Sequence, residues 1–119
     1  MVSVTRIKEK IQRNAAFKEY VFSEMEIAYC ERKANPSESY AVRFAAKEAF
    51  LKALGSGLLV DFELKHIEVN TNEDGVPSFQ FSPEVKKSMI SKWGKEPKVA
   101  LSLSHELDNG IAFVIVQSE

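Results

Sequence analysis

One stretch of this 119-residue chain decides its fold: residues 36–55, which read PSESYAVRFAAKEAFLKALG. Ala, Leu, Lys, Glu and Arg dominate the stretch, and all of them favour the helix. Asn35 suits the N-cap, Pro36 suits the first helical position, and Gly55 suits the left-handed residue that follows the last turn. The stretch therefore predicts one long central helix.

The charges of this helix stand where a packed helix is expected to be apolar. Its residues are apolar nearly all round, a pattern typical of a buried element. Arg43 and Lys47 nevertheless project within or beside the aromatic sector. Glu48 and Lys52 lie at its other margin. Two interpretations stay open: an ordinary Glu48–Lys52 pair across one turn with outward-reaching cations, or a site that holds a charged ligand.

Composition narrows the class of protein. The length suits a single domain over residues 1–119, and 45% hydrophobic with 28% charged residues is ordinary for a globular protein. The net charge of −1 gives no reason to expect nucleic acid or an acidic membrane as partner. No apolar run approaches the roughly 18 residues of a membrane helix. The single Cys30 excludes an internal disulfide and fits a reducing, cytoplasmic compartment.

The segments around the long helix predict an α+β fold, in which an antiparallel sheet is packed against helices. Before that helix we expect a strand stump, a basic helix capped by Thr5, an irregular apolar segment, and a helix that begins with a Ser23–Glu26 capping box. The apolar run at residues 111–116 predicts a central strand. The other elements expected after the long helix are a hairpin at residues 64–82, a helix at 82–94, and a second hairpin within 99–116 with its turn at Asp108-Asn109-Gly110.

Few residues are suited to chemistry. One cysteine and two scattered histidines exclude a Cys/His metal cluster, and no P-loop or dinucleotide fingerprint is present. Glu48 is a carboxylate of the kind that Mg²⁺ takes together with phosphate oxygens. The polar set Ser102, Ser104 and His105 suits a phosphate contact, although a histidine at a strand end is equally a simple hydrogen-bond donor.

Four segments resemble the holo-acyl-carrier-protein synthases, the small bacterial 4′-phosphopantetheinyl transferases. The signature motif is similar to residues 43–57, RFAAKEAFLKALGSG, and the second motif to residues 99–116, VALSLSHELDNGIAFVIV. Residues 22–30, FSEMEIAYC, and residues 72–79, NEDGVPSF, are similar to two further family segments. The likeness spans nearly all of the chain in the expected order.

The resemblance implies a fold, a reaction and a set of residues. The fold is that of the 4′-phosphopantetheinyl transferases. The reaction transfers the phosphopantetheine arm of coenzyme A to a serine of acyl carrier protein with Mg²⁺, in support of fatty acid synthesis. Glu48 is implied as the metal ligand that helps to activate the serine, and Lys52 as a pyrophosphate contact or proton donor to the leaving group. The implied contacts of coenzyme A are Arg43, Lys47, Lys52, Gly55, Ser104 and His105.

The resemblance also implies partners. The family is typically a homotrimer whose active sites are shared between neighbouring subunits. The basic first helix, with Arg6, Lys10 and Arg13, becomes the expected docking surface for the acidic carrier protein.

One departure from the family pattern bears on activity. The family begins with a strand that ends in Gly-x-Asp, and this aspartate is its second metal ligand. VSVTRI matches the residues that follow it, so the aspartate would fall immediately before Met1. Two hypotheses result: an active transferase, favoured by Glu48, Lys52 and His105, and a non-catalytic module that binds carrier protein or coenzyme A, favoured by the absent aspartate.

Overall fold

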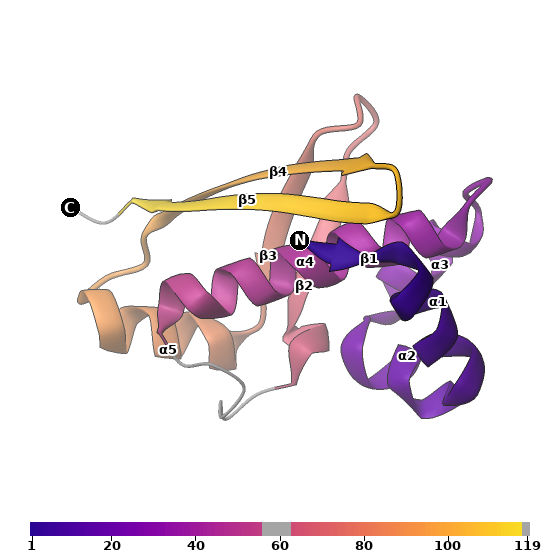
Figure 1. The fold of residues 1–119 in the computed structure, drawn as a ribbon. Helices are drawn as coiled ribbons and strands as arrows, with labels where there is room; N and C mark the ends of the chain where they lie inside the picture. The colour runs from indigo at the N-terminus through magenta and orange to yellow at the C-terminus, as the bar shows by residue number, and fades with distance from the viewer. Residues whose placement is uncertain (56–62, 118–119) are drawn as a thin grey trace.

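Helix α4, Pro36–Leu54, is the central element of the fold (Figure 1). The structure is a computed structural model that describes residues 1–55 and 63–117. The Asn35 side chain accepts a hydrogen bond from the Glu38 amide, Pro36 stands in the first turn, and Gly55 has a φ of 80° after the last. More than half of the residues of α4 are buried, so the predicted long central helix is confirmed.

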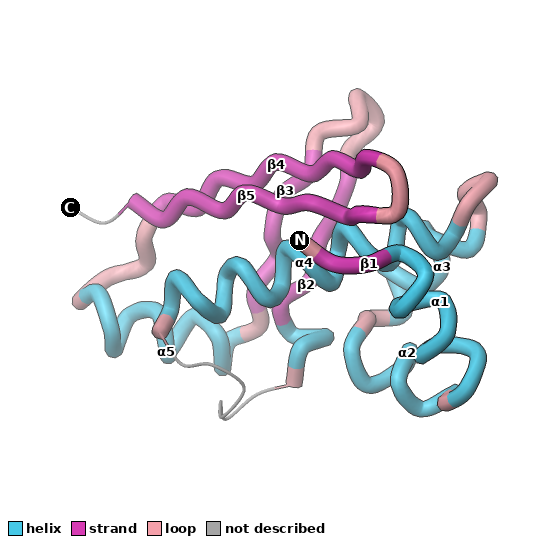
Figure 2. The backbone as a smooth tube through the Cα atoms, in the orientation of Figure 1, coloured by secondary structure: helices cyan, strands magenta, loops and turns pink. Residues whose placement is uncertain are grey.

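Helices cover antiparallel strands throughout the described residues. Besides α4, the elements are β1 Val2–Ser3, α1 Val4–Arg13, α2 Ala15–Val21, α3 Glu24–Glu31, the 3₁₀ turn η1 Leu64–His66, β2 Ile67–Thr71, β3 Pro77–Phe81, α5 Pro83–Trp93, β4 Lys98–Glu106 and β5 Asn109–Gln117. The strands form a three-stranded sheet in the order β1-β5-β4 and a two-stranded sheet of β2 and β3 (Figure 2). The expected α+β class is confirmed, with the strands divided between two sheets, and β5 is the predicted central strand.

Strand β5 lies directly on the backbone of α4. A Cβ atom added at Gly110 would stand 2.9 Å from both the carbonyl carbon of Ala41 and the amide nitrogen of Val42. Only a residue without a side chain permits this approach. Gly110 therefore sets the distance between the three-stranded sheet and the central helix.

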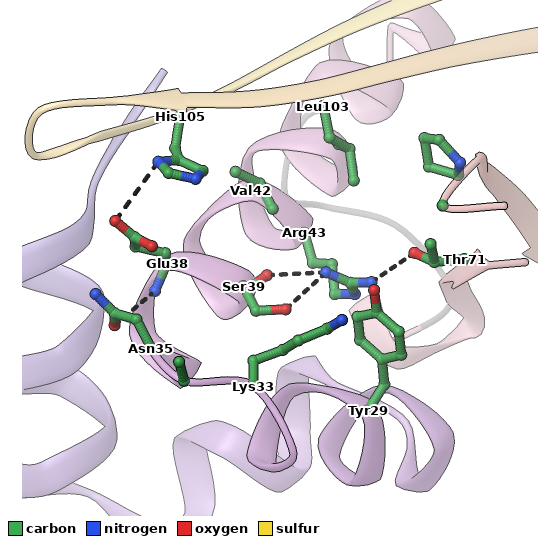
Figure 3. A pocket seen from close by; sticks show the side chains of 13 residues that line it. Tyr29, Lys33, Asn35, Glu38, Ser39, Val42, Arg43, Thr71, Leu103 and His105 are labelled. Carbon is green, nitrogen blue, oxygen red and sulfur yellow. Dashed lines mark hydrogen bonds and ion pairs between the residues drawn. The ribbon is translucent and has the colours of Figure 1, made fainter. Parts of the chain in front are cut away.

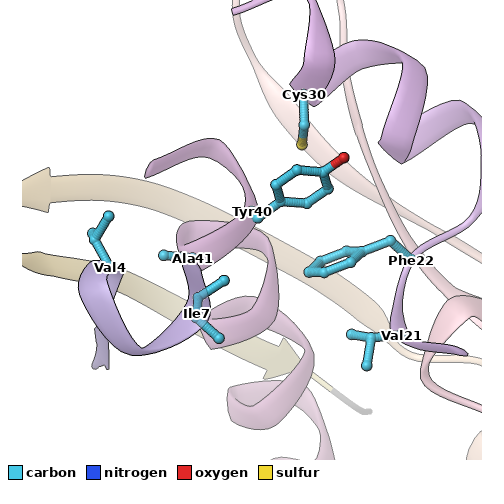
Figure 4. Packing of buried hydrophobic residues seen from close by; sticks show 7 residues of the cluster. All are labelled: Val4, Ile7, Val21, Phe22, Cys30, Tyr40 and Ala41. Atoms are coloured by element: carbon cyan, nitrogen blue, oxygen red, sulfur yellow. The ribbon is translucent and has the colours of Figure 1, made fainter. Parts of the chain in front are cut away.

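Two apolar clusters lie along α4. The first surrounds its N-terminal half and consists of Val4, Ile7, Val21, Phe22, Cys30, Tyr40 and Ala41 (Figure 4). The second surrounds its C-terminal half and consists of Phe50, Leu51, Leu54, Ile67, Val85 and Met89. Because α4 contributes to both clusters, it joins the N-terminal helices to α5 and the β2–β3 hairpin.

Two local predictions before α4 are wrong. The expected irregular segment contains α2, since Asn14 caps this helix by accepting a hydrogen bond from Ala16 N and does not simply break the chain. A segment of seven residues is too short for its periodicity to predict a helix. The α2 helix is stabilised by tertiary packing of Val21, which is 2% exposed. The N-cap of α1 is Ser3, and not Thr5.

Two predictions after α4 need correction as well. The expected hairpin strand at residue 64 begins only at Ile67, because residues 64–66 form η1. The turn of the second hairpin lies at Leu107–Asp108, where Leu107 takes a φ of 55°, and β5 already begins at Asn109.

Asp108 explains this earlier turn, because its carboxylate caps the start of α1. It accepts hydrogen bonds from Ser3 Oγ at 2.9 Å, Thr5 N at 3.0 Å and Thr5 Oγ1 at 2.7 Å. The bonds from Thr5 and Ser3 lower the pKa of the Asp108 carboxyl. The turn therefore ties the C-terminal hairpin to the first helix.

Of the helices that the structure describes, none is long and apolar enough to cross a membrane.

Candidate functional site

A pocket of about 420 Å³ opens where α3, α4, the β2–β3 hairpin and β4 meet (Figure 3). Its walls are mostly polar or small side chains. They are Tyr29, Lys33, Ala34, Asn35, Glu38, Ser39, Val42, Arg43, Thr71, Gly75, Pro77, Leu103 and His105. Two of the residues implied by the family resemblance, Arg43 and His105, are thus brought together from segments far apart in the sequence.

Arg43 is the chemically decisive residue of this pocket. It is only 3% exposed. Its Nη1 donates to the Ser39 carbonyl at 3.2 Å and to Ser39 Oγ at 2.9 Å, and its Nη2 donates to Thr71 Oγ1 at 2.8 Å. No described residue offers it a carboxylate, and Nε has no hydrogen-bond partner among them. A buried charge without a counter-charge among the described residues points to an anionic ligand.

Two cationic side chains lie against the ring of Tyr29 in the pocket. The guanidinium carbon of Arg43 lies 4.4 Å from the centre of the Tyr29 ring, and Lys33 Nζ lies 4.5 Å from it. Burial raises the pKa of the Tyr29 phenol, but hydrogen bonds to Lys33 and Thr71 and the charges of Lys33 and Arg43 outweigh burial and lower it. The pocket therefore stabilises negative charge.

His105 stands at the rim of the pocket. Its Nδ1 is 3.5 Å from Oε2 of Glu38, in the first turn of α4, and its side chain is 54% exposed (Figure 3). Ser104 is also exposed, but strand alternation turns it to the face opposite to Leu103 and His105, so it does not line the pocket.

Lys47 lies outside this pocket and is fully enclosed. Its ammonium is 2.8 Å from Glu26 Oε1, and its side chain is 0% exposed. A phosphate would have to displace Glu26 and enter the core to reach it. The structure therefore does not bring Lys47, expected as a coenzyme A contact, to the pocket that holds Arg43 and His105.

Glu48 and Lys52 are turned away from Arg43 on the same helix. Glu48 lies five positions after Arg43 in the helix, which corresponds to a rotation of about 140°. Glu48 is half-buried and Lys52 is exposed. At the end of the helix, a Cβ atom added at Gly55 would lie 3.1 Å from Nζ of Lys92 in α5. The predicted site residues are thus divided between two places on this chain, the pocket at Arg43 and a strip formed by Glu48, Lys52 and Gly55.

The donors for a metal ion are few. The described residues contain no group of three or more His, Cys, Asp and Glu residues placed to hold an ion. On its strip, Glu48 is the one carboxylate among the described residues. This fits Mg²⁺ in part, because the ion takes one or two carboxylates and completes its shell with water and phosphate oxygens.

The expected docking residues Arg6, Lys10 and Arg13 are all exposed on α1. Arg13 pairs with Glu9 across one turn at 3.5 Å, and Lys10 Nζ lies 5.7 Å from the Phe17 ring. Basic side chains are therefore available to a partner on this helix.

The pocket residues that sequence reasoning missed include four polar ones, Tyr29, Lys33, Ser39 and Thr71. Their own segments hold no chemical motif. The one available signal was Arg43, since a cation predicted within a buried helix requires polar or aromatic neighbours.

The sequence is similar to proteins of a known family. A sequence profile of the 4′-phosphopantetheinyl transferase superfamily matches residues 1–106. A holo-[acyl-carrier-protein] synthase of Cytophaga hutchinsonii is 44% identical over 115 residues, which cover 97% of this chain and 91% of the relative. Another, from Clostridium tetani, is 40% identical over 119 residues, which cover 100% of this chain and 92% of the relative.

The fold is similar to solved structures of the same family. The holo-[acyl-carrier-protein] synthase of Helicobacter pylori in complex with coenzyme A has a TM-score of 0.81 and 30% identity, covering 98% of this chain and 95% of that one. The synthase of Neisseria meningitidis has a TM-score of 0.85 and 31% identity, covering 98% and 93%. The chain therefore belongs to the holo-[acyl-carrier-protein] synthases, a family of phosphopantetheinyl transferases.

Proposed function

We propose that this chain transfers the 4′-phosphopantetheine arm of coenzyme A to a serine of apo acyl carrier protein, and so supports fatty acid synthesis. The observation that carries the proposal is the buried guanidinium of Arg43 in an open pocket, which no carboxylate of the described residues neutralises. Coenzyme A bears three phosphate groups that can neutralise it. The relatives named as holo-[acyl-carrier-protein] synthases, and the one in complex with coenzyme A, support the same ligand.

The proposed reaction is a displacement at phosphorus. The serine oxygen bonds to the phosphorus that carries pantetheine, the bond from that phosphorus to the bridging oxygen breaks, and adenosine 3′,5′-bisphosphate leaves with the electron pair. In this proposal Glu48 accepts the serine proton, directly or through water. Lys52, one turn later, neutralises or protonates the departing phosphate in the same proposal. Positioning and charge neutralisation supply most of the catalysis in such transfers.

Mg²⁺ is proposed as the cofactor of the Glu48 strip. Glu48 would hold it together with phosphate oxygens of coenzyme A. When bound, the ion neutralises charge on the pyrophosphate.

We further propose that a complete site forms between subunits of a homotrimer. The Arg43 pocket and the Glu48 strip lie on different sides of α4, so a neighbouring copy can join one half-site to the other. The outer face of β4–β5 is available for such an interface. Phe113 and Ile115 on this face are 68% and 66% exposed, and exposed apolar patches of this kind commonly mark interfaces.

A trimer is expected by sedimentation at micromolar concentration. Replacing Phe113 and Ile115 with Ser should dissociate it, because the interface would lose its apolar contacts. Val76→Ser is the matched control, since Val76 is 55% exposed at a different place, the turn between β2 and β3. A wild-type chain that sediments as a clean monomer would contradict the proposed assembly.

The proposed function is tested first through Arg43. Arg43→Met keeps much of the side-chain volume and removes the charge, so coenzyme A affinity measured by calorimetry should fall by about 10- to 100-fold, the range expected for a lost charged hydrogen-bonding group. Arg13→Met removes an exposed arginine from α1 and should leave the affinity unchanged. If both variants bind coenzyme A like the wild type, the pocket does not hold this ligand.

A non-catalytic binding module is the second candidate function. It is favoured by the single carboxylate that the described residues place on the Glu48 strip. The two functions separate in one assay with coenzyme A, Mg²⁺ and apo carrier protein. Transfer increases the carrier-protein mass by one phosphopantetheine group, whereas a binding module leaves that mass unchanged.

The docking surface is tested by charge reversal. Changing Arg6 and Lys10 to Glu should raise the apparent KM for carrier protein by roughly three- to tenfold at low salt and less at high salt, because exposed charges are screened. The KM for coenzyme A should stay nearly unchanged. Lys87→Glu with Lys95→Glu makes the same change in net charge on exposed residues outside α1. Equal effects of both double variants, or equal effects on both substrates, would contradict docking at α1.

A further inference from the structure

The Lys47 ammonium is fully engaged inside the protein. Its three N–H groups match three acceptors: Glu26 Oε1 at 2.8 Å, the Leu64 carbonyl at 3.0 Å and the Ile67 carbonyl at 2.6 Å. Burial lowers the pKa of this ammonium, and the charge of Glu26 opposes that shift. With every donor paired, Lys47 serves no ligand and instead joins α4 to η1 and β2.

The Glu26 carboxylate is engaged in the same way. Besides Lys47, its Oε1 accepts from the Ser23 amide at 2.9 Å, which closes the capping box of α3. Its Oε2 accepts from the Val69 amide at 2.9 Å. The carboxylate thus joins the start of α3 to the middle of β2.

Together the two side chains occupy the free edge of β2. In the part of the chain that the structure describes, this strand pairs with β3 alone, on one side. The Ile67 carbonyl and the Val69 amide, two residues apart, point to the same edge of the strand. Lys47 donates to the first and Glu26 accepts from the second. The ion pair therefore takes the place of a neighbouring strand and fixes the position of β2 along α4.

The other end of β2 reaches the ligand pocket. Arg43, one helical turn before Lys47, donates to Thr71 Oγ1 at 2.8 Å. A shift of β2 by two residues moves it by about 6.8 Å. Such a shift would carry Thr71 out of reach of Arg43 and displace the pocket walls at Gly75 and Pro77.

We propose that Glu26 and Lys47 are positioning residues for coenzyme A, which hold the β2–β3 hairpin in the one register that completes the Arg43 pocket. This inference rests on the proposed function. A buried ion pair is seldom retained for stability alone, because apolar residues of similar volume often stabilise a fold equally well. The specific contribution of the Glu26–Lys47 pair is to set the position of the β2–β3 hairpin.

The test is the double variant Glu26→Gln with Lys47→Met, which removes both charges of the pair together, so that neither is left in the core without its partner. We expect it to unfold cooperatively on heating, with the KM for coenzyme A raised about tenfold or more and the KM for carrier protein within about twofold of wild type. Exchange of the Val69 amide with solvent should become faster, since its acceptor is weakened. Unchanged coenzyme A binding in the folded double variant overturns the proposal.

Met89→Ala is the control for general loosening. Met89 is a buried residue of α5 without a bond to the free edge of β2. If this variant raises the KM for coenzyme A as much as the double variant does, the effect is not one of register and the proposal fails. Should the double variant not fold, Glu26→Gln alone decides: faster Val69 exchange with unchanged coenzyme A affinity overturns it.

Calorimetry with coenzyme A on the wild-type chain separates this inference from the function on which it rests. No binding by the wild type refutes the proposed ligand. Equal binding by wild type and double variant refutes only the positioning role.

Discussion

Glu48→Gln should abolish phosphopantetheine transfer, with a loss of at least about 100-fold in rate, while the protein keeps its fold. The amide preserves the shape of the side chain and removes its charge, and so removes both the proposed proton acceptor and the proposed oxygen ligand. The measurement is the mass increase on apo carrier protein at fixed Mg²⁺. Circular dichroism and thermal unfolding check the fold.

Glu84→Gln is the matched control for this variant. Glu84 is an exposed carboxylate in the first turn of α5. Its replacement should leave transfer unchanged. Full activity of Glu48→Gln would remove Glu48 from the proposed mechanism, whatever the behaviour of the control.

Adding a short N-terminal extension that ends in Gly-x-Asp should lower the Mg²⁺ concentration needed and raise the rate by about 100-fold or more, because a second carboxylate both holds and orients the ion. The register of β1 supports this expectation. Val2 pairs with Gly110, so a residue placed before Met1 continues the ladder opposite Ala112. Gly110 faces α4, Ala112 shares that face, and cross-strand partners point to the same side. The added aspartate would therefore face the helix that carries Glu48.

An extension ending in Gly-x-Asn is the control, since it has the same length and lacks the charge. It should leave the Mg²⁺ requirement of the chain unchanged. If the chain without any extension is already fully active at low Mg²⁺, another oxygen serves as the second ligand and this account of the metal site is wrong.

Local signals predicted most of the fold. Asn35, Pro36 and Gly55 delimit α4, and Ser23 with Glu26 opens α3, because cap hydrogen bonds join residues only a few positions apart. Because such signals act only between nearby residues, they did not predict the elements that depend on distant contacts. The α2 helix depends on tertiary packing, and the turn after β4 is set by Asp108, whose partners belong to the first helix.

The candidate site was less predictable than the fold. Arg43 and His105 were both implied as coenzyme A contacts by resemblance, and the structure places them at one pocket. Whether that pocket binds coenzyme A stays a prediction. The pairing of Lys47 with Glu26 could not be predicted, because Glu26 lies 21 residues earlier and no pattern within either helix joins them. Two charges one turn apart on the same helix can therefore differ, so that one lines a pocket and the other is paired in the core. Tertiary contacts decide which.

The bonds from Asp108 to Ser3 and Thr5 have a consequence for the order of folding. They close a loop of more than 100 residues, with a separation of 103 between Thr5 and Asp108. Contacts so distant in sequence form late, because the chain must first lose the entropy of closing that loop. During synthesis, the start of α1 stays uncapped by this carboxylate until the last hairpin has been made. The helix proposed to dock the carrier protein is thus synthesised well before the carboxylate that caps it.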